Sequence, residues 1–167
     1  MRALDVEIVG AFTAVRIDGS LEQHLTNSWL RGDFTPGSRG IVITDTGGTW
    51  VRDVDVVQFE VGVSLEPAAG KLVAWSHFDN VLADSNTSHG FQFVGAGGIP
   101  GFSCVRCWTS SNGFDPVSQA ITNINARGMY IGNGLGLSFA ESRVINNGGH
   151  GLEVGSGARD IEISGGI

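Results

Sequence analysis

Four carboxylates stand where acid and base groups could act on a sugar: Asp79, Asp84, Asp115 and Glu153. Cleavage of a glycosidic bond needs two carboxyl groups at a defined separation. Asp115 and Glu153 each follow a glycine and an apolar residue, and this shared position predicts that they stand on one outward face. Their backbones would lie ~5 Å apart on adjacent stacked strands and ~10 Å apart one strand further on. Those separations bracket retaining and inverting geometries, and solvated surface charges are the alternative interpretation.

Asp79 and Asp84 flank Asn80 at a polar corner, with His77 and His89 nearby in the sequence. Acid, amide and imidazole groups together could bind a sugar or a cation. Ordinary turn chemistry, in which Asp and Asn side chains satisfy backbone amides, explains the same pattern.

Tryptophans offer a second chemistry, because an indole ring can stack on a sugar ring. The chain has four, Trp29, Trp50, Trp75 and Trp108, and we take Trp75 and Trp108 as the candidates for binding glycan. Packing in the core or between subunits is the alternative for all four.

The two cysteines, Cys104 and Cys107, form a lone C-x-x-C. Zinc needs four ligands, and no second C-x-x-C or H-x-x-x-H accompanies it. A redox motif would sit between a strand and a helix, which the flanking residues do not indicate. We therefore expect no metal site, no cofactor and no bond between the two sulfurs, with at least one thiol buried as a small apolar group.

The composition limits the classes of protein that remain. Of 167 residues 26 are glycine, without the period of collagen, and 41% are hydrophobic, which is too apolar for a disordered chain. A net charge of −7 argues against nucleic acid as a partner. The sequence shows no signal peptide and no run long enough to insert in a membrane.

A repeat of glycine, apolar, any, apolar runs along the chain. Its copies begin at Gly40, Gly62, Gly90, Gly136 and Gly151, with a degraded copy at Gly113, so the spacings are 22, 28, 23, 23 and 15 residues. Segments this short cannot bury their apolar face alone, but stacking at ~4.8 Å buries a continuous column. We expect this column to contain at least five of Ile41, Val63, Phe91, Phe114, Leu137 and Leu152.

A second pattern, Arg52-Asp53-Val54-Asp55-Val56, is echoed at residues 4–8 and 159–163. Glycine and asparagine between the segments favour sharp corners, and stacked asparagines can bond along a ladder. These features predict an all-β fold, a right-handed parallel β-helix of about six coils. A β-sandwich or jelly roll is the alternative, although it does not require a 23-residue recurrence. Residues 20–30 have roughly helical spacing and could form a short capping helix.

The segments Asn146-Asn147-Gly148-Gly149-His150-Gly151-Leu152-Glu153-Val154 and 159–163 resemble coils of the pectate-lyase-like β-helix superfamily. Within it, the short coils are most similar to bacteriophage tailspikes and related virion proteins. The resemblance implies a homotrimer, and it leaves open polysaccharide lyases, glycoside hydrolases, adhesins and particle proteins, because fold does not determine function.

We expect residues 1–39 to form a lead-in segment with a first irregular coil, and residues 40–167 to form the remaining coils. The expected protein is a trimeric virion component, made in the host cytoplasm, that attaches to bacterial surface polysaccharide or stabilises the particle with other virion proteins. A polysaccharide-degrading enzyme, or a fragment of one, is the alternative. The last segment lacks a polar cap, so we expect further chain or a partner to cover it.

Overall fold

The computed structural model describes residues 2–115 and 117–165, and every regular element in these residues is a β-strand. The strands are β1 Arg2–Leu4, β2 Glu7–Val9, β3 Thr13–Ile17, β4 Gln23–Arg31, β5 Arg39–Ile43, β6 Thr49–Val57, β7 Val61–Leu65, β8 Ser76–Asp84, β9 Phe91–Phe93, β10 Ser103–Val105, β11 Trp108–Ser110, β12 Met129–Ala140, β13 Arg143–Ile145 and β14 Leu152–Ser164.

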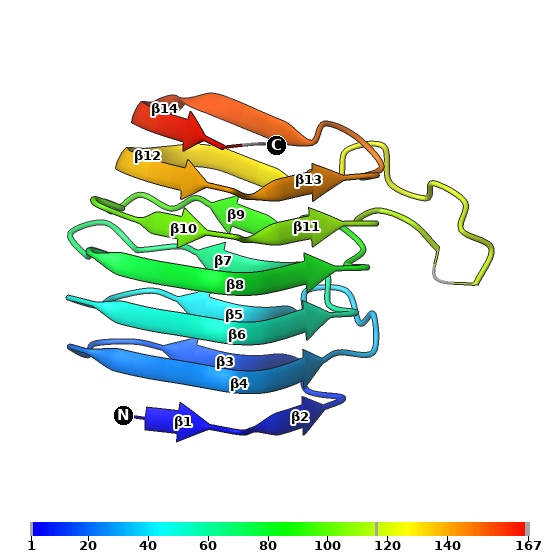
Figure 1. Ribbon diagram of the computed structural model, residues 1–167, viewed down its shortest axis with the longest axis horizontal. Helices are drawn as coiled ribbons and strands as arrows, with labels where there is room; N and C mark the ends of the chain where they lie inside the picture. Colours follow the sequence, from blue (N-terminus) through cyan, green and yellow to red (C-terminus); the bar gives the residue numbers. More distant parts are fainter. Residues whose placement is uncertain (1, 116, 166–167) are drawn as a thin grey trace.

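All pairings between these strands are parallel, and each strand pairs with its counterpart in the next coil. Figure 1 shows the resulting stack, with β1 and β2 at one end and β14 at the other. The prediction of a parallel β-helix of about six coils is confirmed, and the β-sandwich is excluded because its sheets would be antiparallel. Strands β1 to β4 already take part in the parallel pairing, although they lie within residues 1–39, the segment predicted to form a lead-in and a first irregular coil.

Two faces enclose the core. The short-strand face consists of β3, β5, β7, β9 and the first parts of β12 and β14. The long-strand face consists of β4, β6 and β8, continued by β10 with β11 and by the end of β12 with β13. Each coil thus runs through a short strand, a corner and a long strand before it returns.

One residue bends each long strand in its middle. This bend residue has a positive φ in every coil: Asp5, Asn27, Asp53, Asn80, Arg106 and Glu141. The pairing between strands passes over the bend residue: Thr26 pairs with Arg52 and Ser28 pairs with Val54. The side-chain alternation therefore restarts after the bend, and residues three apart across it both face the interior.

The interior column on the short-strand face contains four of the predicted residues, Ile41, Val63, Phe91 and Leu152, one fewer than the minimum expected, and its other members are Val15 and Met129. Two predicted members lie elsewhere. Leu137 is buried behind the long-strand face, opposite Ile161, and Phe114 belongs to a loop, residues 114–126, that leaves the coil (Figure 1). The missed copy of the repeat is Gly128-Met129-Tyr130-Ile131, which this loop separates from Gly90 by 38 residues.

Aromatic rings fill the widest part of the core. Phe78, Phe93, Phe102 and Phe139 are buried, and their neighbouring ring centroids lie 4.8–5.8 Å apart in tilted and edge-to-face arrangements. Such pairs add to the free energy gained from burying their apolar area.

The predicted capping helix at residues 20–30 is wrong, because residues 23–31 form strand β4. The bend residue Asn27 has φ 49° and interrupts the alternation of the strand. Leu25 and Leu30 are both buried, whereas Trp29 is exposed. Apolar residues therefore recur at irregular intervals that imitate helical spacing.

The prediction that the cysteines are not bonded to each other is also wrong. Cys104 and Cys107 form a disulfide, with their Cα atoms 5.9 Å apart, and both residues are fully buried. A regular strand would point residues i and i+3 to opposite faces. Arg106, the bend residue between them, resets the alternation and turns both sulfurs inward.

An asparagine ladder supports the corner after the long strands, as the sequence indicates. Asn86, Asn112 and Asn147 are stacked in successive coils. Asn112 is fully buried: its Oδ1 accepts hydrogen bonds from the backbone and side-chain amides of Asn86, and its Nδ2 donates to Asn147 Oδ1 and Thr109 Oγ1. Each side chain thus satisfies the backbone of the coil before it.

Replacing Asn112 by alanine should lower the free energy of unfolding by about 2 kcal/mol, because it leaves the buried amides of Asn86 without an acceptor. Urea denaturation measures this change. Asn125→Ala, at an exposed position whose side chain lies outside the ladder, should change stability by less than about 0.5 kcal/mol. Equal losses in the two variants would contradict the ladder's role.

Candidate ligand-binding groove

Three adjoining hollows follow the outward side of the long-strand face. The first, about 350 Å³, is lined by Arg2, His24, Trp50 and Arg52, and shares Trp50 and Arg52 with the second, about 330 Å³. The second shares Arg106 with a third hollow of about 700 Å³ near the C-terminal coils. We call the three together the groove. It crosses the coils from β1 to β12, a distance of roughly 24 Å at the spacing of paired strands.

Three stacked rings form the floor of the first two hollows. His24, Trp50 and His77 occupy one outward column of β4, β6 and β8. Trp50 lies 4.3 Å from His77 and 6.3 Å from His24, measured between ring centroids, and both pairs are stacked. His77 Nδ1 is also 2.6 Å from Ser103 Oγ in the next coil. The rings cover one another's faces, and Trp50 remains 48% exposed along the groove.

Polar contacts between coils line the bend. Asn80 Nδ2 donates to Asp53 Oδ1 at 2.8 Å, and Arg106 Nη2 lies 2.5 Å from Asp79 Oδ1. Arg52 pairs with Asp53 at 3.4 Å. These contacts hold charged and amide side chains in place along the groove.

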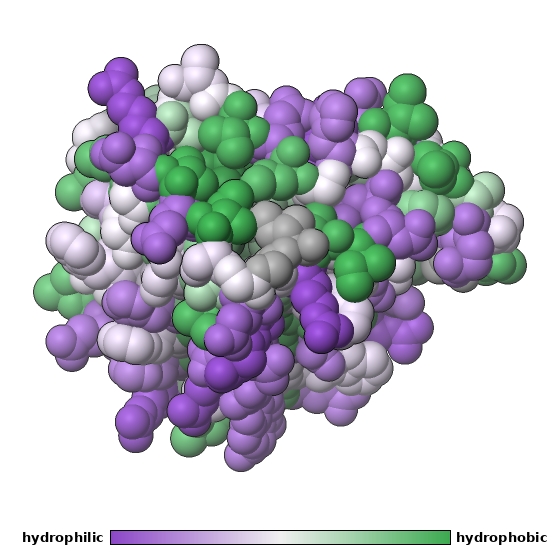
Figure 2. All heavy atoms as spheres, turned by 45° about the horizontal axis from the view of Figure 1, so that its top comes forward, coloured by the Kyte–Doolittle hydropathy of each residue, from purple (hydrophilic) through white to green (hydrophobic). Residues whose placement is uncertain are grey.

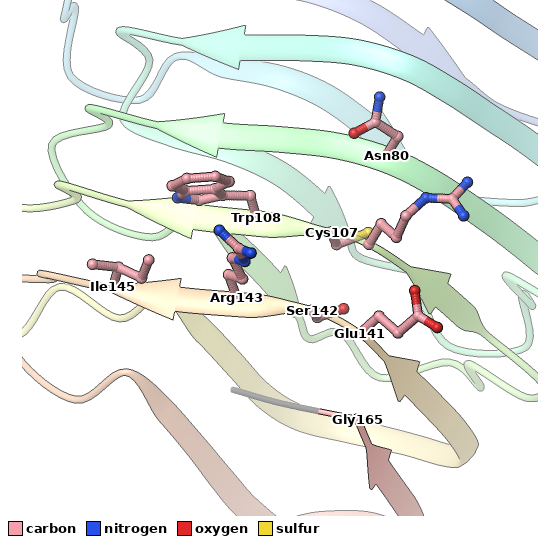
Figure 3. A pocket seen from close by; sticks show the side chains of 9 residues that line it. Asn80, Cys107, Trp108, Glu141, Ser142, Arg143, Ile145 and Gly165 are labelled. Atoms are coloured by element: carbon pink, nitrogen blue, oxygen red, sulfur yellow. The ribbon is translucent and has the colours of Figure 1, made fainter.

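The third hollow is the largest, and its side chains come from several coils (Figure 3). Trp108 and Arg143 are paired in register on β11 and β13, and the Arg143 guanidinium lies over the indole, 5.3 Å from its centroid. Glu141 and Arg106, the bend residues of two successive coils, line the same hollow, with Cys107 behind them.

Of the carboxylates singled out in the sequence, Asp79 and Asp84 lie on either side of the bend in β8. Asp79 lines the second hollow and pairs with Arg106, whereas Asp84 accepts hydrogen bonds from Ser110 Oγ at 2.5 Å and Ser85 Oγ at 2.8 Å. His77 lies in the groove, but His89 belongs to the short-strand face, so the predicted cluster is divided.

Asp84 has a neighbour that the sequence did not single out. Asp55 stands diagonally opposite it on β6, where Val57 pairs with Asp84 and Asp55 pairs with Leu82. Partial burial raises the pKa of Asp55, and the charge of Asp84 raises that pKa further. Both carboxylates face outward beside the groove.

Asp115 and Glu153 do not share a column. Glu153 pairs in register with Tyr130 and forms an ion pair with Arg127, and the hydrogen bond from Arg127 lowers the pKa of Glu153. Asp115 lies in the loop of residues 114–126, where it accepts hydrogen bonds from Ser118 and from the backbone amide of Val117. The bonds from Ser118 lower the pKa of Asp115, which is ordinary turn chemistry.

The two tryptophan candidates also separate. Trp108 lines the third hollow, but Trp75 precedes β8 at a corner, and its ring lies against Gly101 of the next coil, outside the groove. The sequence analysis missed Trp50 as a groove residue. The sequence feature that indicates Trp50 is the similarity of two segments, His24-Leu25-Thr26-Asn27 and Trp50-Val51-Arg52-Asp53. In both, an aromatic ring stands three residues before the bend residue.

A second cluster occupies the short-strand face. His89, Asn125, Arg127, Tyr130 and Glu153 line a hollow of about 160 Å³. His89 Nδ1 accepts a hydrogen bond from the backbone amide of Arg127 at 3.1 Å, which places the remaining proton of a neutral ring on Nε2. Burial lowers the pKa of His89, and the charge of Arg127 lowers it further.

No helix in the part of the chain that the structure describes could span a membrane, and none of its His, Cys, Asp and Glu side chains gather in a group suited to a metal ion. No protein-family model, curated protein or solved structure matches the chain. The geometry of the groove is therefore the basis for inferring a function.

The depressed pKa of His89 predicts a stability that depends on pH. Because the unfolded chain protonates His89 at the ordinary value of 6.5 and the folded chain only at lower pH, the free energy of unfolding should fall as the pH drops below about 6.5 and level off beneath the folded pKa. His89→Gln retains an acceptor but cannot titrate, so it should show a smaller loss between about pH 7.5 and 5.5 in urea denaturation.

Asn125→Ala is the matched control, because Asn125 lines the same hollow and carries no titratable group. It should keep the pH dependence of the original chain. A His89→Gln variant that loses as much stability on acidification as the original chain would show that His89 is not the responsible group.

Proposed function

We propose that the chain is a receptor-binding protein of a bacteriophage virion, which attaches to host-surface glycan through the groove. The observation that carries this proposal is the continuity of the three hollows across the coils. An extended polysaccharide could lie along such a groove and meet similar side chains at each coil. Rings, guanidinium groups and amides are the groups that contact sugars.

The disulfide and the likeness to phage spikes support a virion role. A bond between Cys104 and Cys107 persists in an oxidising environment, which suits a protein that acts outside a cell after its synthesis in the host cytoplasm. The resemblance to tailspikes rests on the repeated coil, and the parallel stack is compatible with it. Attachment to other virion proteins, or stabilisation of the particle, belongs to the same proposal.

A glycan-degrading enzyme is the second candidate, and one observation favours it. Asp55 has a raised pKa beside Asp84, and two carboxyl groups whose environments separate their pKa values are suited to acid and base roles. Asp55 is nevertheless exposed, and Asp84 is already bonded to two hydroxyl groups. We therefore favour binding without cleavage.

Incubation with purified bacterial capsule and O-antigen oligosaccharides tests both functions. Binding by calorimetry with no change in the length of the glycan is the expected result. Trp50→Ala should weaken binding about 5- to 10-fold, which corresponds to ~1 kcal/mol for one lost aromatic contact. Trp29→Ala is the control, since Trp29 is similarly exposed on β4 but lines none of the three hollows. Shortened glycan would favour the enzyme.

We further propose that the working unit is a homotrimer. An apolar ridge of Leu21, Leu72, Trp75 and Leu135, each more than half exposed, follows the corner before the long strands. Three of these side chains lie on glycines of the next coil: Leu21 on Gly47, Leu72 on Gly98 and Trp75 on Gly101. Exposed apolar rows of this kind mark interfaces, and side-by-side packing about a threefold axis would bury the ridge of each of the three subunits.

Light scattering should give a mass of three times 17.5 kDa. Leu72→Asp should reduce it to one subunit, because a charge placed in the ridge would be buried without a partner. Val117→Asp, at a 91% exposed position in the loop, should leave the mass unchanged. A single-subunit mass for the original chain would rule out the trimer.

A further inference from the structure

We infer that the third hollow is the subsite that selects the glycan, and that it takes an uncharged sugar residue whose hydroxyl groups bridge Arg143 and Glu141. This inference rests on the proposed glycan binding and deepens it. It is argued from the side chains that line the hollow, from their charges and from the backbone that presents them.

Arg143 and Glu141 are both unpaired. Among the ion pairs and hydrogen bonds of residues 2–115 and 117–165, neither side chain has a partner, although both line the same hollow. Arg143 is held only by the Trp108 ring, 5.3 Å from its guanidinium carbon. The other guanidinium in the hollow, Arg106, is neutralised by Asp79. Figure 3 shows Arg143 beneath the indole and Glu141 at the far side of the hollow.

The two free groups specify the ligand. A guanidinium only donates hydrogen bonds, and a carboxylate only accepts them. A ligand between them must therefore accept on one side and donate on the other, which a sugar hydroxyl does at every position. A carboxylate on the sugar would be attracted by Arg143 but repelled by Glu141, and an ammonium group would meet the reverse, so neither charge gains the net attraction that a single unpaired group would give. The Trp108 ring supplies an apolar wall for the sugar's C–H groups.

The backbone supports a ligand role for this position. In the first four coils the bend residue is Asp or Asn, which tolerate a positive φ, but in the two coils at the hollow it is Arg106, with φ 54°, and Glu141, with φ 51°. Long side chains in this conformation are strained, and both of these line the hollow. The bend residue is therefore no longer Asp or Asn in the two coils whose bend side chains line the hollow.

The test uses the full chain and calorimetry with two sets of probes, neutral O-antigen oligosaccharides and uronic-acid-containing capsule oligosaccharides. The original chain should prefer the neutral set. Arg143→Gln and Glu141→Gln should each weaken binding of the best neutral probe about 10- to 100-fold, the effect of losing a hydrogen bond to a charged group. Arg159→Gln and Glu7→Gln, at exposed positions that line none of the three hollows, should bind as the original chain does.

The outcomes separate the two proposals. Binding that survives both Arg143→Gln and Glu141→Gln but is weakened in Trp50→Ala would overturn the subsite and leave glycan attachment standing. A preference for the acidic set, with tighter binding in Glu141→Gln, would overturn the uncharged ligand. Binding to neither set would overturn glycan attachment and this inference together. Thermal melts of every variant confirm that the change is not one of folding.

Discussion

The long strands of this chain bend where one residue adopts the left-handed backbone conformation, and stacking puts that residue at one position in every coil. Asp5, Asn27, Asp53 and Asn80 meet this requirement at low cost, because their short polar side chains tolerate a positive φ. The bend resets the alternation, so residues on both sides of it fill the core. It also aligns the outward side chains into the columns that make the groove.

The last two bends show what this constraint costs. Arg106 and Glu141 hold the same conformation without the advantage of Asp or Asn, at a cost of roughly 1 kcal/mol each. The Cys104–Cys107 disulfide spans the first of these bends from inside the core and restrains it. The pairing of β12 with β14 restrains the second, since Ala140 pairs with Ser164 immediately before it. At both bends the strained residue presents a long side chain to the third hollow.

The sequence was sufficient for the architecture and for part of the register. Glycine followed by alternating apolar residues located Gly40, Gly62, Gly90 and Gly151 correctly, because a Cβ at these positions would collide with a neighbouring coil. It missed Gly128, because the loop of residues 114–126 lengthened one interval and drew the alignment to Gly113 and Gly136. Local spacing cannot distinguish an inserted loop from a coil, and only the pairing of Met129 with Phe91 and Leu152 does so.

The site was harder to predict, because the side-chain alternation restarts after the bend and this changes which residues of the strand face outward. The echo of residues 52–56 at residues 4–8 is correct, because Asp5 and Asp53 are both bend residues. The echo at 159–163 has the same local conformation, with Asp160 at φ 54°, but it lies at a different place in the coil, because Ile161 pairs with Leu137 before the bend. The same restart of the alternation at the bend explains why the disulfide was not predicted. The carboxylates could be selected by their chemistry alone, whereas Trp50, Glu141 and Arg143 are recognised as groove residues only once the coils are stacked.

Charge decides which glycan such a groove can hold. The chain carries a net charge of −7, so its overall field opposes the approach of an acidic polysaccharide. Within the groove opposite charges lie near one another at three places, with Arg106 beside Asp79, Arg52 beside Asp53, and Arg143 across from Glu141, whereas Arg2 adds a positive charge at the first hollow. At physiological salt the field of distant carboxylates is screened within ~8 Å, and contacts inside the groove dominate. In the third hollow, where Arg143 lies across from Glu141, a charged ligand would be attracted by one group and repelled by the other, whereas hydroxyl groups match both and are unaffected by the net charge of the protein.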